Sequence, residues 1–177
     1  MSMFESSLLC SMAVVIAVTT LSAVAQSPNL GESLSAQDIA QVDYFVQPDG
    51  QGLPVGSGNA KTGAGLYQVH CLACHGTAGE QGINDRLAGG HGSIDTDSPV
   101  KTVGSYWPYA TTVFDYLRRA MPYTAPGSLS ADEIYALTAY LLFINGIVEE
   151  GQTLNAGNLP LVSMPNAENF VWAVAAD

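Results

Sequence analysis

Two thiols and an imidazole lie close together in the segment Cys71-Leu72-Ala73-Cys74-His75. The spacing C-x-x-C-H is typical of the covalent attachment of a c-type haem, because two thiols about one helical turn apart can add to the two vinyl groups of one porphyrin. The adjacent histidine then lies under the iron as its proximal ligand. The motif predicts one haem c, attached covalently through Cys71 and Cys74, with His75 as an iron ligand.

A redox dithiol and half of a zinc site are the alternatives for the same residues. A redox-active C-x-x-C pair usually lies in a βαβ unit, and no such pattern surrounds Cys71. A structural zinc site needs a second pair of ligands, which the sequence lacks. The remaining cysteine, Cys10, lies inside an apolar N-terminal run, so the haem interpretation is favoured.

The opposite face of the iron needs a second axial ligand. A methionine thioether is the usual choice in electron-carrying cytochromes, because it favours ferrous iron. The methionines that follow the apolar N-terminal run are Met121 and Met164. Met121 follows one predicted helix and precedes another, where a loop can wrap the far side of the porphyrin, so we favour it over Met164. Burial in the core is the alternative for either methionine.

Three helical segments are expected to position these ligands, at residues 61–71, 110–120 and 130–145. The last has the strongest signals, because Ser130 and Glu133 form a capping box and an apolar stripe follows them. The glycine-rich stretch after the C-x-x-C-H motif is typical of a loop, and no alternating strand pattern is present. The sequence therefore predicts an all-α fold.

The composition excludes several classes of protein. The 177 residues are 47% hydrophobic and only 12% charged, so the chain can bury a core but is too short for a large multidomain enzyme. Five lysines and arginines against 16 aspartates and glutamates give a net charge of −11. This charge argues against nucleic acid as a partner, because phosphate binding depends on cationic side chains.

Composition and charge also divide the chain into four segments. All five cations lie in the middle of the chain, which is nearly neutral, whereas both flanks are acidic. We expect a signal peptide at residues 1–25, an acidic extension or linker at 26–59, a cytochrome c domain at 60–146, and an acidic and apolar C-terminal extension at 147–177.

The N-terminal segment predicts export. An apolar run from Leu8 to Val24 ends in a small-x-small pattern, and we expect cleavage after Ala25. The run is slightly shorter than the roughly twenty residues that span a bilayer, so a retained membrane anchor is the less favoured alternative. The protein is therefore expected in the periplasm, and at the membrane only if the leader is retained.

Several motifs together resemble the class I cytochrome c fold over about residues 60–146. They are Gly63-x-x-x-Tyr67, the CLACH motif, Met121-Pro122, and Leu137-x-x-Tyr140-Leu141. The resemblance implies three to five helices wrapped around one covalently bound haem. It also implies that the first and last helices cross, with Gly63 allowing their close approach and Tyr67 and Tyr140 packing at the crossing.

A narrower resemblance covers roughly residues 76–170. The run from Lys101 to Val148 and the tail Met164-Pro165-Asn166 look like the cytochrome subunit of sulfur-oxidising (Sox) sulfane and sulfite dehydrogenases. In that family a molybdenum-cofactor subunit oxidises a sulfur substrate and passes electrons to the haem protein. The resemblance thus implies a redox partner, a molybdenum-cofactor dehydrogenase subunit, and a downstream electron acceptor.

The resemblance further implies that Tyr106, Trp107 or Tyr109 approach the haem propionates, with core packing as the alternative for each. One departure concerns the loop after the haem motif, which in the family reads Gly-Pro-Asn. A backbone carbonyl of that loop accepts the second N–H of the proximal histidine. Here the segment is Gly82-Ile83-Asn84-Asp85-Arg86-Leu87, so a carbonyl can still accept that hydrogen bond, but without the fixed backbone angle of a proline.

One haem with both axial positions filled by protein leaves no open position for a substrate. The chain is then expected to exchange single electrons and to act with an oxidoreductase, without a substrate site of its own. We expect the electron-accepting subunit or partner of a molybdenum-type sulfite or sulfane dehydrogenase. A stand-alone or membrane-anchored carrier between respiratory complexes is the main alternative, and a haem ligand sensor with an open sixth position is the lesser one.

Overall fold

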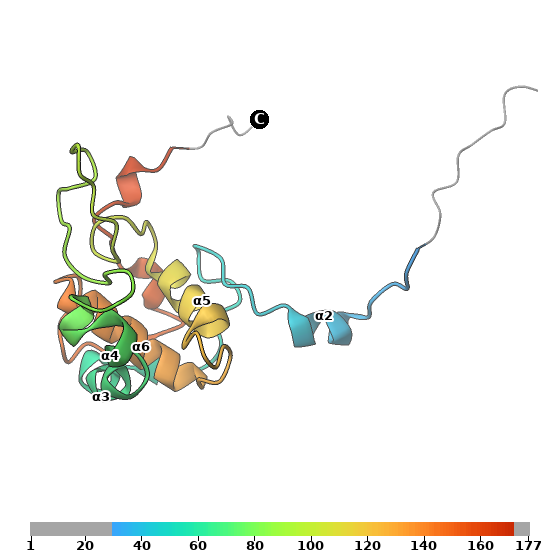
Figure 1. Cartoon of the computed structure of the whole chain (residues 1–177). Coiled ribbons are helices and arrows are strands. Elements are labelled where there is room, and N and C mark those ends of the chain that lie inside the picture. Colours follow the sequence, from blue (N-terminus) through green and yellow to red (C-terminus); the bar gives the residue numbers. More distant parts are fainter. Residues whose placement is uncertain (1–29, 172–177) are drawn as a thin grey trace, which may run out of the picture. The chain divides into compact units, whose positions relative to one another are not determined.

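Helices α3, α5 and α6 form the framework of the computed structural model, which describes residues 30–171 (Figure 1). The chain divides between Ile39 and Ala40 into two compact units, and every element from β1 onward lies in the second. The elements in chain order are α2 (Ala36–Val42), β1 (Ser57–Gly58), α3 (Ala60–His70), α4 (Leu72–His75), η1 (Thr77–Gly79), α5 (Ala110–Ala120), α6 (Ala131–Ile144), β2 (Leu154–Asn155), η2 (Leu159–Leu161) and η3 (Ala167–Asn169). The three predicted helices are thus confirmed as α3, α5 and α6.

Helix α6 starts at the predicted capping box and is buried on almost all sides. The Ser130 hydroxyl oxygen accepts the backbone N–H of Glu133 (3.4 Å), and the Glu133 carboxylate accepts the backbone N–H of Ser130 (2.8 Å). Every residue from Ile134 to Leu142 is buried. A helix that is apolar all round must lie between other elements, and α6 packs against α3, β1 and α5. It is therefore the element on which the others are placed.

Helices α3 and α6 approach each other closely at Gly63. A Cβ atom on Gly63 would lie 2.0 Å from the carbonyl oxygen of Ala136 and 2.8 Å from the Cβ of Tyr140. Farther along α3, the rings of Tyr67 and Tyr140 meet with their centroids 5.0 Å apart. The Tyr67 hydroxyl donates to the carbonyl of Gly76 (2.9 Å), which ties α3 to the segment after the haem motif. This is the helix packing that the class I resemblance implies.

The C-terminal segment packs on the same unit as the helices. Strands β1 and β2 form an antiparallel ladder of two residues each, which is too short to show an alternating sequence pattern. Leu154, Leu159 and Met164 are buried in the hydrophobic core. The side-chain amide of Asn166 donates to the carbonyl of Tyr106 (2.8 Å). The C-terminal extension of the sequence analysis is, as far as residue 171, part of the compact unit.

The segment before α3 is likewise part of this unit. Residues Tyr44–Ser57, which we call the arm, lie along α5 and the start of α6. Val46 of the arm is fully buried, and the Tyr135 hydroxyl of α6 donates to the carbonyl of Pro54 (2.9 Å). The compact unit therefore begins before residue 60, where the sequence predicts the start of the domain. The composition of this stretch is typical of a linker, but hydrogen bonds to α5 and α6 hold it against the helices.

Helix α2 lies within the residues expected to form a linker. Its start is capped by Ser35, whose hydroxyl oxygen accepts the backbone N–H of Asp38 (3.1 Å), while the Asp38 carboxylate accepts the backbone N–H of Ser35 (3.1 Å). The predicted signal peptide at residues 1–25 lies outside the described residues. Within residues 30–171, no helix is long and apolar enough to cross a membrane.

Candidate haem-binding site

The C-x-x-C-H motif lies where α3 ends and α4 begins. Cys71 caps the end of α3, and its carbonyl accepts the backbone N–H groups of Cys74 (3.1 Å) and His75 (2.9 Å). This turn keeps the two thiols and the imidazole within about one helical turn of one another. Both cysteines are partly buried, and the pair has the spacing that thioether formation requires.

The electrostatics of the Cys71 thiol do not fit a redox dithiol. Burial, together with the neighbouring Cys74, raises the pKa of the Cys71 thiol to about 11. A redox dithiol needs the opposite shift, because the thiolate is the nucleophile in disulfide exchange. Among residues 30–171, no group of three or more His, Cys, Asp or Glu side chains is placed to hold a metal ion.

The His75 ring is oriented by a backbone carbonyl. Its Nδ1 lies 2.8 Å from the carbonyl oxygen of Asp85, and because a carbonyl only accepts, Nδ1 carries the proton and donates. The other nitrogen, Nε2, is then the unprotonated one in a neutral imidazole. This is the tautomer that a metal ion binds, with the hydrogen bond fixing the direction of the ring.

The loop that presents Asp85 is held without the proline of the family pattern. The backbone N–H of Asn84 donates to the carbonyl of Cys74 (2.9 Å). Gly82 lies so close to the motif that a Cβ atom there would be 2.2 Å from the carbonyl oxygen of Cys74 and 2.6 Å from the Cα of His75. These close backbone contacts place the Asp85 carbonyl beside the imidazole.

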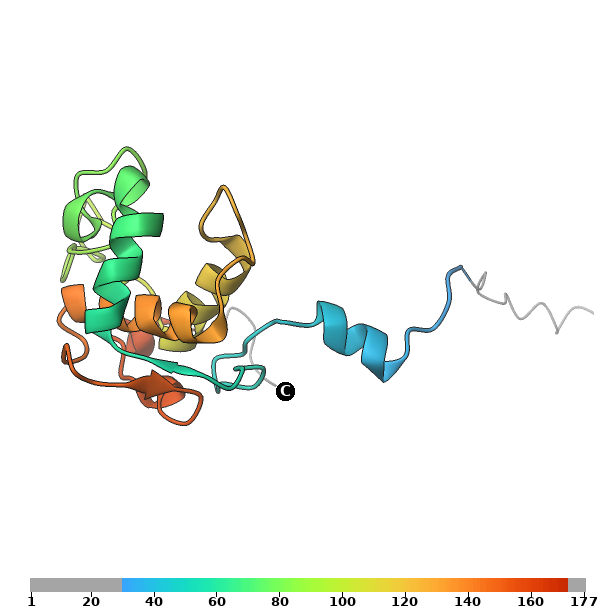
Figure 2. The ribbon, with the colours of Figure 1, turned by 90° about the horizontal axis from the view of Figure 1, so that it is seen from below.

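Met121 is the first residue after α5 and opens the loop that leads to α6. Its backbone N–H donates to the carbonyl of Leu117 (3.3 Å), and its side chain is partly buried against the core. Figure 2 shows this loop standing across from α3 and α4, with α6 running beneath both. The haem motif and the loop that begins at Met121 therefore face each other, and α6 connects the two sides at their base.

Met164 is almost completely enclosed by protein. Its side chain is 3% exposed and belongs to the hydrophobic core cluster. A methionine that binds iron must present its sulfur to the porphyrin, and a side chain covered by protein atoms cannot do so without displacing them. This burial fits the core alternative for Met164 and favours Met121 as the ligand.

Tyr106, Trp107 and Tyr109 lie in the segment just before α5. The ring of Tyr106 packs edge-on against Phe170, with centroids 5.5 Å apart, and Trp107 packs in the same way against Tyr116 at 5.7 Å. Tyr106 and Tyr109 are each 37% exposed. The aromatic contacts of Tyr106 and Trp107 are with protein side chains, and an approach to the haem propionates stays a prediction for all three residues.

The described residues fit a covalently bound haem c. Two thiols one turn apart can attach the porphyrin, and the imidazole, whose Nδ1 is hydrogen-bonded to the Asp85 carbonyl, leaves Nε2 for the iron. Met121, at the start of the facing loop, is the favoured second ligand. The sequence indicates that the carbonyl that orients His75 comes from residues 82–87. It does not identify Asp85 as that residue, because every residue in the segment has a backbone carbonyl. The hydrogen bond from the Tyr67 hydroxyl to the carbonyl of Gly76 could not be predicted either, because the sequence indicated only that Tyr67 packs at the helix crossing.

Comparisons with known proteins point to a c-type cytochrome. Residues 58–141 match the family model described as Cytochrome C oxidase, cbb3-type, subunit III. A chain of the crystal structure of the sulfane dehydrogenase SoxCD from Paracoccus pantotrophus is 44% identical to this one, with a TM-score of 0.76, over 82% of this chain and 72% of that chain. No curated protein matches the chain.

An identity of 44% over most of both chains establishes a family relationship as well as a shared fold. The all-α fold is that of class I cytochrome c, and the cofactor is haem c, attached covalently through Cys71 and Cys74. The chain belongs to the class I c-type cytochromes, as a Sox-like member of that family.

Proposed function

We propose that this cytochrome accepts single electrons from a molybdenum-type sulfite or sulfane dehydrogenase subunit and passes them to a downstream acceptor. The observation that carries the proposal is the 44% identity, over 82% of the chain, to a chain of the sulfane dehydrogenase SoxCD structure. The chain is an electron-transfer haem protein, and haem supplies a one-electron exchange between ferric and ferrous iron. Because the oxidation of sulfite to sulfate releases two electrons, each such oxidation by the partner would require two successive one-electron transfers.

The proposal includes Met121 as the sixth iron ligand. The position of its loop across from α3 and α4 supports this assignment, as does the burial of Met164. With both His75 and Met121 bound to the iron, no position would be open to a substrate, and the chain would be restricted to electron transfer. A thioether ligand stabilises ferrous iron, which suits a protein that accepts electrons.

The ligand is tested by absorption spectra of the variants Met121→Ala and Met164→Ala. Loss of the Met121 side chain should abolish the methionine–ferric iron charge-transfer band and let the ferrous protein bind carbon monoxide. The Met164 variant is the matched control, which should keep the band but unfold at lower temperature, because a buried side chain is removed. Loss of the band in the Met164 variant alone would reverse the assignment. Rapid carbon monoxide binding by the wild-type protein would instead indicate a ligand sensor.

The partner is tested by purification of the cytochrome from its native host. We expect it to elute with one larger molybdenum-containing subunit, and its haem to become reduced when sulfite or a sulfane substrate is added to that complex. A cytochrome that elutes alone, and that respiratory complexes reduce and oxidise, would be a diffusing carrier, and the dehydrogenase proposal would be wrong.

The proposal also places the mature protein in the periplasm. The apolar run that ends at Val24 and the small residues before Gln26 support cleavage at this point. The mature protein from the native host should therefore begin at Gln26 and appear in the periplasmic fraction. A chain that keeps residues 1–25 and sediments with membranes would show that the leader is an anchor.

A further inference from the structure

We propose that the arm, Tyr44–Ser57, is a positioning element for the sixth iron ligand, and that it acts through Asp115 of α5. The inference rests on the proposed ligation by Met121. It concerns the last turns of α5, which ends at Ala120, directly before the ligand. Asp115 is thus a positioning residue, because it acts on the ligand through the helix that carries it.

Asp115 joins the arm to the end of α5. The residue is only 3% exposed, and its Oδ1 accepts the backbone N–H of Val46 at 3.0 Å. The guanidinium of Arg119 donates to both carboxylate oxygens, with Nε 3.0 Å from each. Because a buried carboxylate needs such partners to be stable, Asp115 holds the arm and the last turn of the helix in one arrangement.

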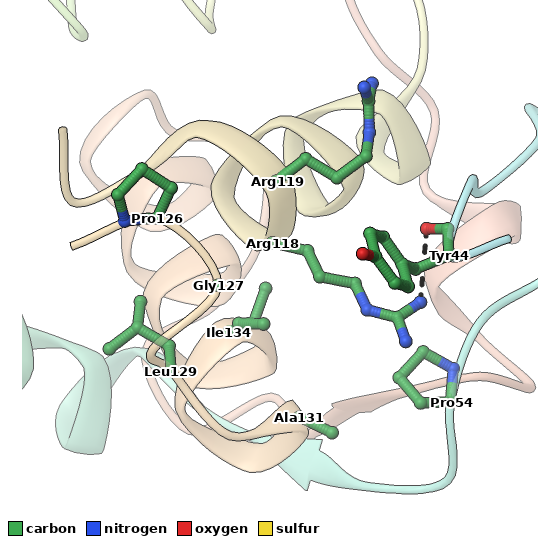
Figure 3. A pocket seen from close by; sticks show the side chains of 9 residues that line it. All are labelled: Tyr44, Pro54, Arg118, Arg119, Pro126, Gly127, Leu129, Ala131 and Ile134. Carbon is green, nitrogen blue, oxygen red and sulfur yellow. Dashed lines mark hydrogen bonds between the residues drawn. The ribbon is translucent and has the colours of Figure 1, made fainter. Parts of the chain in front are cut away.

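Arg118 makes a second connection beside the first. Its Nη1 donates to the carbonyl of Tyr44 (3.2 Å) and to that of Gly52 (3.4 Å), and Figure 3 shows the side chain reaching from α5 to Tyr44. The guanidinium also lies over the Tyr44 ring, 5.6 Å from its centroid, while that of Arg119 lies 5.8 Å from the centroid of Phe45. The two residues that precede Ala120 at the end of α5 are therefore both held by the arm.

The arm can influence Met121 through its contacts with α5, and not through contacts with the loop that follows Met121. A pocket of about 460 Å³ lies between the arm and the loop that follows Met121 (Figure 3). Its walls include Tyr44 and Pro54 of the arm, Arg118 of α5, and Pro126, Gly127 and Leu129 of the loop. Among residues 30–171, no hydrogen bond joins the arm to residues 121–129. The end of α5 is thus the connection by which the arm can hold the sulfur in place.

This connection predicts how the ligand responds when the arm is released. A ligand sulfur must be held at bonding distance from the iron, so added freedom in the last turn of α5 shifts the equilibrium towards released methionine. Imidazole added to the ferric protein competes with the sulfur for the sixth position. Its apparent affinity therefore reports how often the sulfur leaves the iron.

The experiment compares holo-protein variants of the full chain. Asp115→Ala should raise the apparent affinity for imidazole about tenfold and weaken the methionine–ferric iron band, as expected for the loss of a hydrogen bond to a charged group. Arg118→Gln, which removes the second connection, should raise the affinity in the same direction and serves if Asp115→Ala does not accumulate. Asp132→Ala is the matched control, because Asp132 accepts the backbone N–H of Ser57 (2.7 Å) and ties the arm to the start of α6 instead. It should lower the unfolding temperature but leave the imidazole affinity unchanged.

The outcomes separate this inference from the proposed function. If imidazole affinity rises equally in the Asp132 variant, or in none of the variants, the arm contributes only general stability and the inference is wrong, while ligation by Met121 stands. If the wild-type protein lacks the methionine band and Met121→Ala leaves its spectrum unchanged, the proposed ligation fails and the inference fails with it.

Discussion

Replacing Gly63 by alanine should force α3 and α6 apart. The added Cβ would lie 2.0 Å from the carbonyl oxygen and 2.6 Å from the carbonyl carbon of Ala136, and these are backbone atoms that no side-chain rotation can move. Ordinary van der Waals contact begins at 3.4 Å, so the helices must separate locally by about 1.4 Å, the difference between 3.4 and 2.0 Å. The aromatic pair of Tyr67 and Tyr140 lies at the same crossing and would loosen as well.

The free energy of unfolding should fall by about 2–3 kcal/mol. Overpacking of a core costs about 1–3 kcal/mol, and this case belongs at the upper end because the clash is with backbone. A loosened aromatic pair adds about 0.5–1.5 kcal/mol. Alanine is the better helix former by about 1 kcal/mol, which offsets part of the loss. At about 3 °C for each kcal/mol, the unfolding temperature should fall by about 6–9 °C.

The assay is thermal unfolding of the holo-protein, followed by far-UV circular dichroism. Gly65→Ala in the same helix is the control, because no atom beyond its own stretch of helix lies within 4 Å of the added Cβ. Only helix propensity should act there, raising stability by about 0.5–1 kcal/mol and the unfolding temperature by about 1.5–3 °C. Equal shifts in the two variants, or a Gly63 variant as stable as the wild type, would refute the argument from close packing.

Three further predictions follow from single contacts. Burial raises the pKa of Tyr135 to about 12 from 10.0, because the folded protein favours the neutral hydroxyl. The contribution of Tyr135 to the free energy of unfolding is therefore complete below about pH 10 and is lost as the pH rises towards 12. In urea titrations, Tyr135→Phe should make the free energy of unfolding fall less steeply with pH over that range, and an unchanged pH dependence would contradict this. At neutral pH the variant should be less stable by about 1 kcal/mol, because the hydrogen bond to Pro54 is removed. Ser130→Ala removes the capping box with Glu133 and should cost about 1 kcal/mol, and an unshifted urea midpoint would show that the cap is dispensable. Cys74→Ser should leave the haem held by one thioether, so the pyridine haemochrome band should move to longer wavelength, and a band that does not move would exclude Cys74 as an attachment site.

Local chemistry could be predicted from the sequence because its determinants lie close together in the chain. Cys71, Cys74 and His75 act through their spacing within one helical turn, which is why the motif alone identifies the cofactor. Ser130 and Glu133 are three residues apart, and their capping box marks the start of α6. The class I fold followed from such local patterns together with the family resemblance, and the structure and the comparisons confirm it.

Contacts between distant residues could not be predicted in this way. The hydrogen bond from Val46 to Asp115 spans 69 positions, and that from Arg118 to Tyr44 spans 74. Neither a helical period nor a turn signal relates residues so far apart in the chain. From the sequence alone, the arm is therefore recognised only by its composition, which is typical of a linker. The same reason explains why the burial of Met164, which depends on how the C-terminal segment packs, was an open alternative.

The sequence by itself determined that this chain carries haem c, which residues attach it, and which helices surround it. Only the tertiary structure decided that the carbonyl of Asp85 orients His75, that Met164 is enclosed in the core, and that the arm holds the end of α5. The physical reason is that covalent chemistry and helix formation depend on neighbours in the chain. The surroundings of a side chain depend instead on segments that folding brings together from far apart.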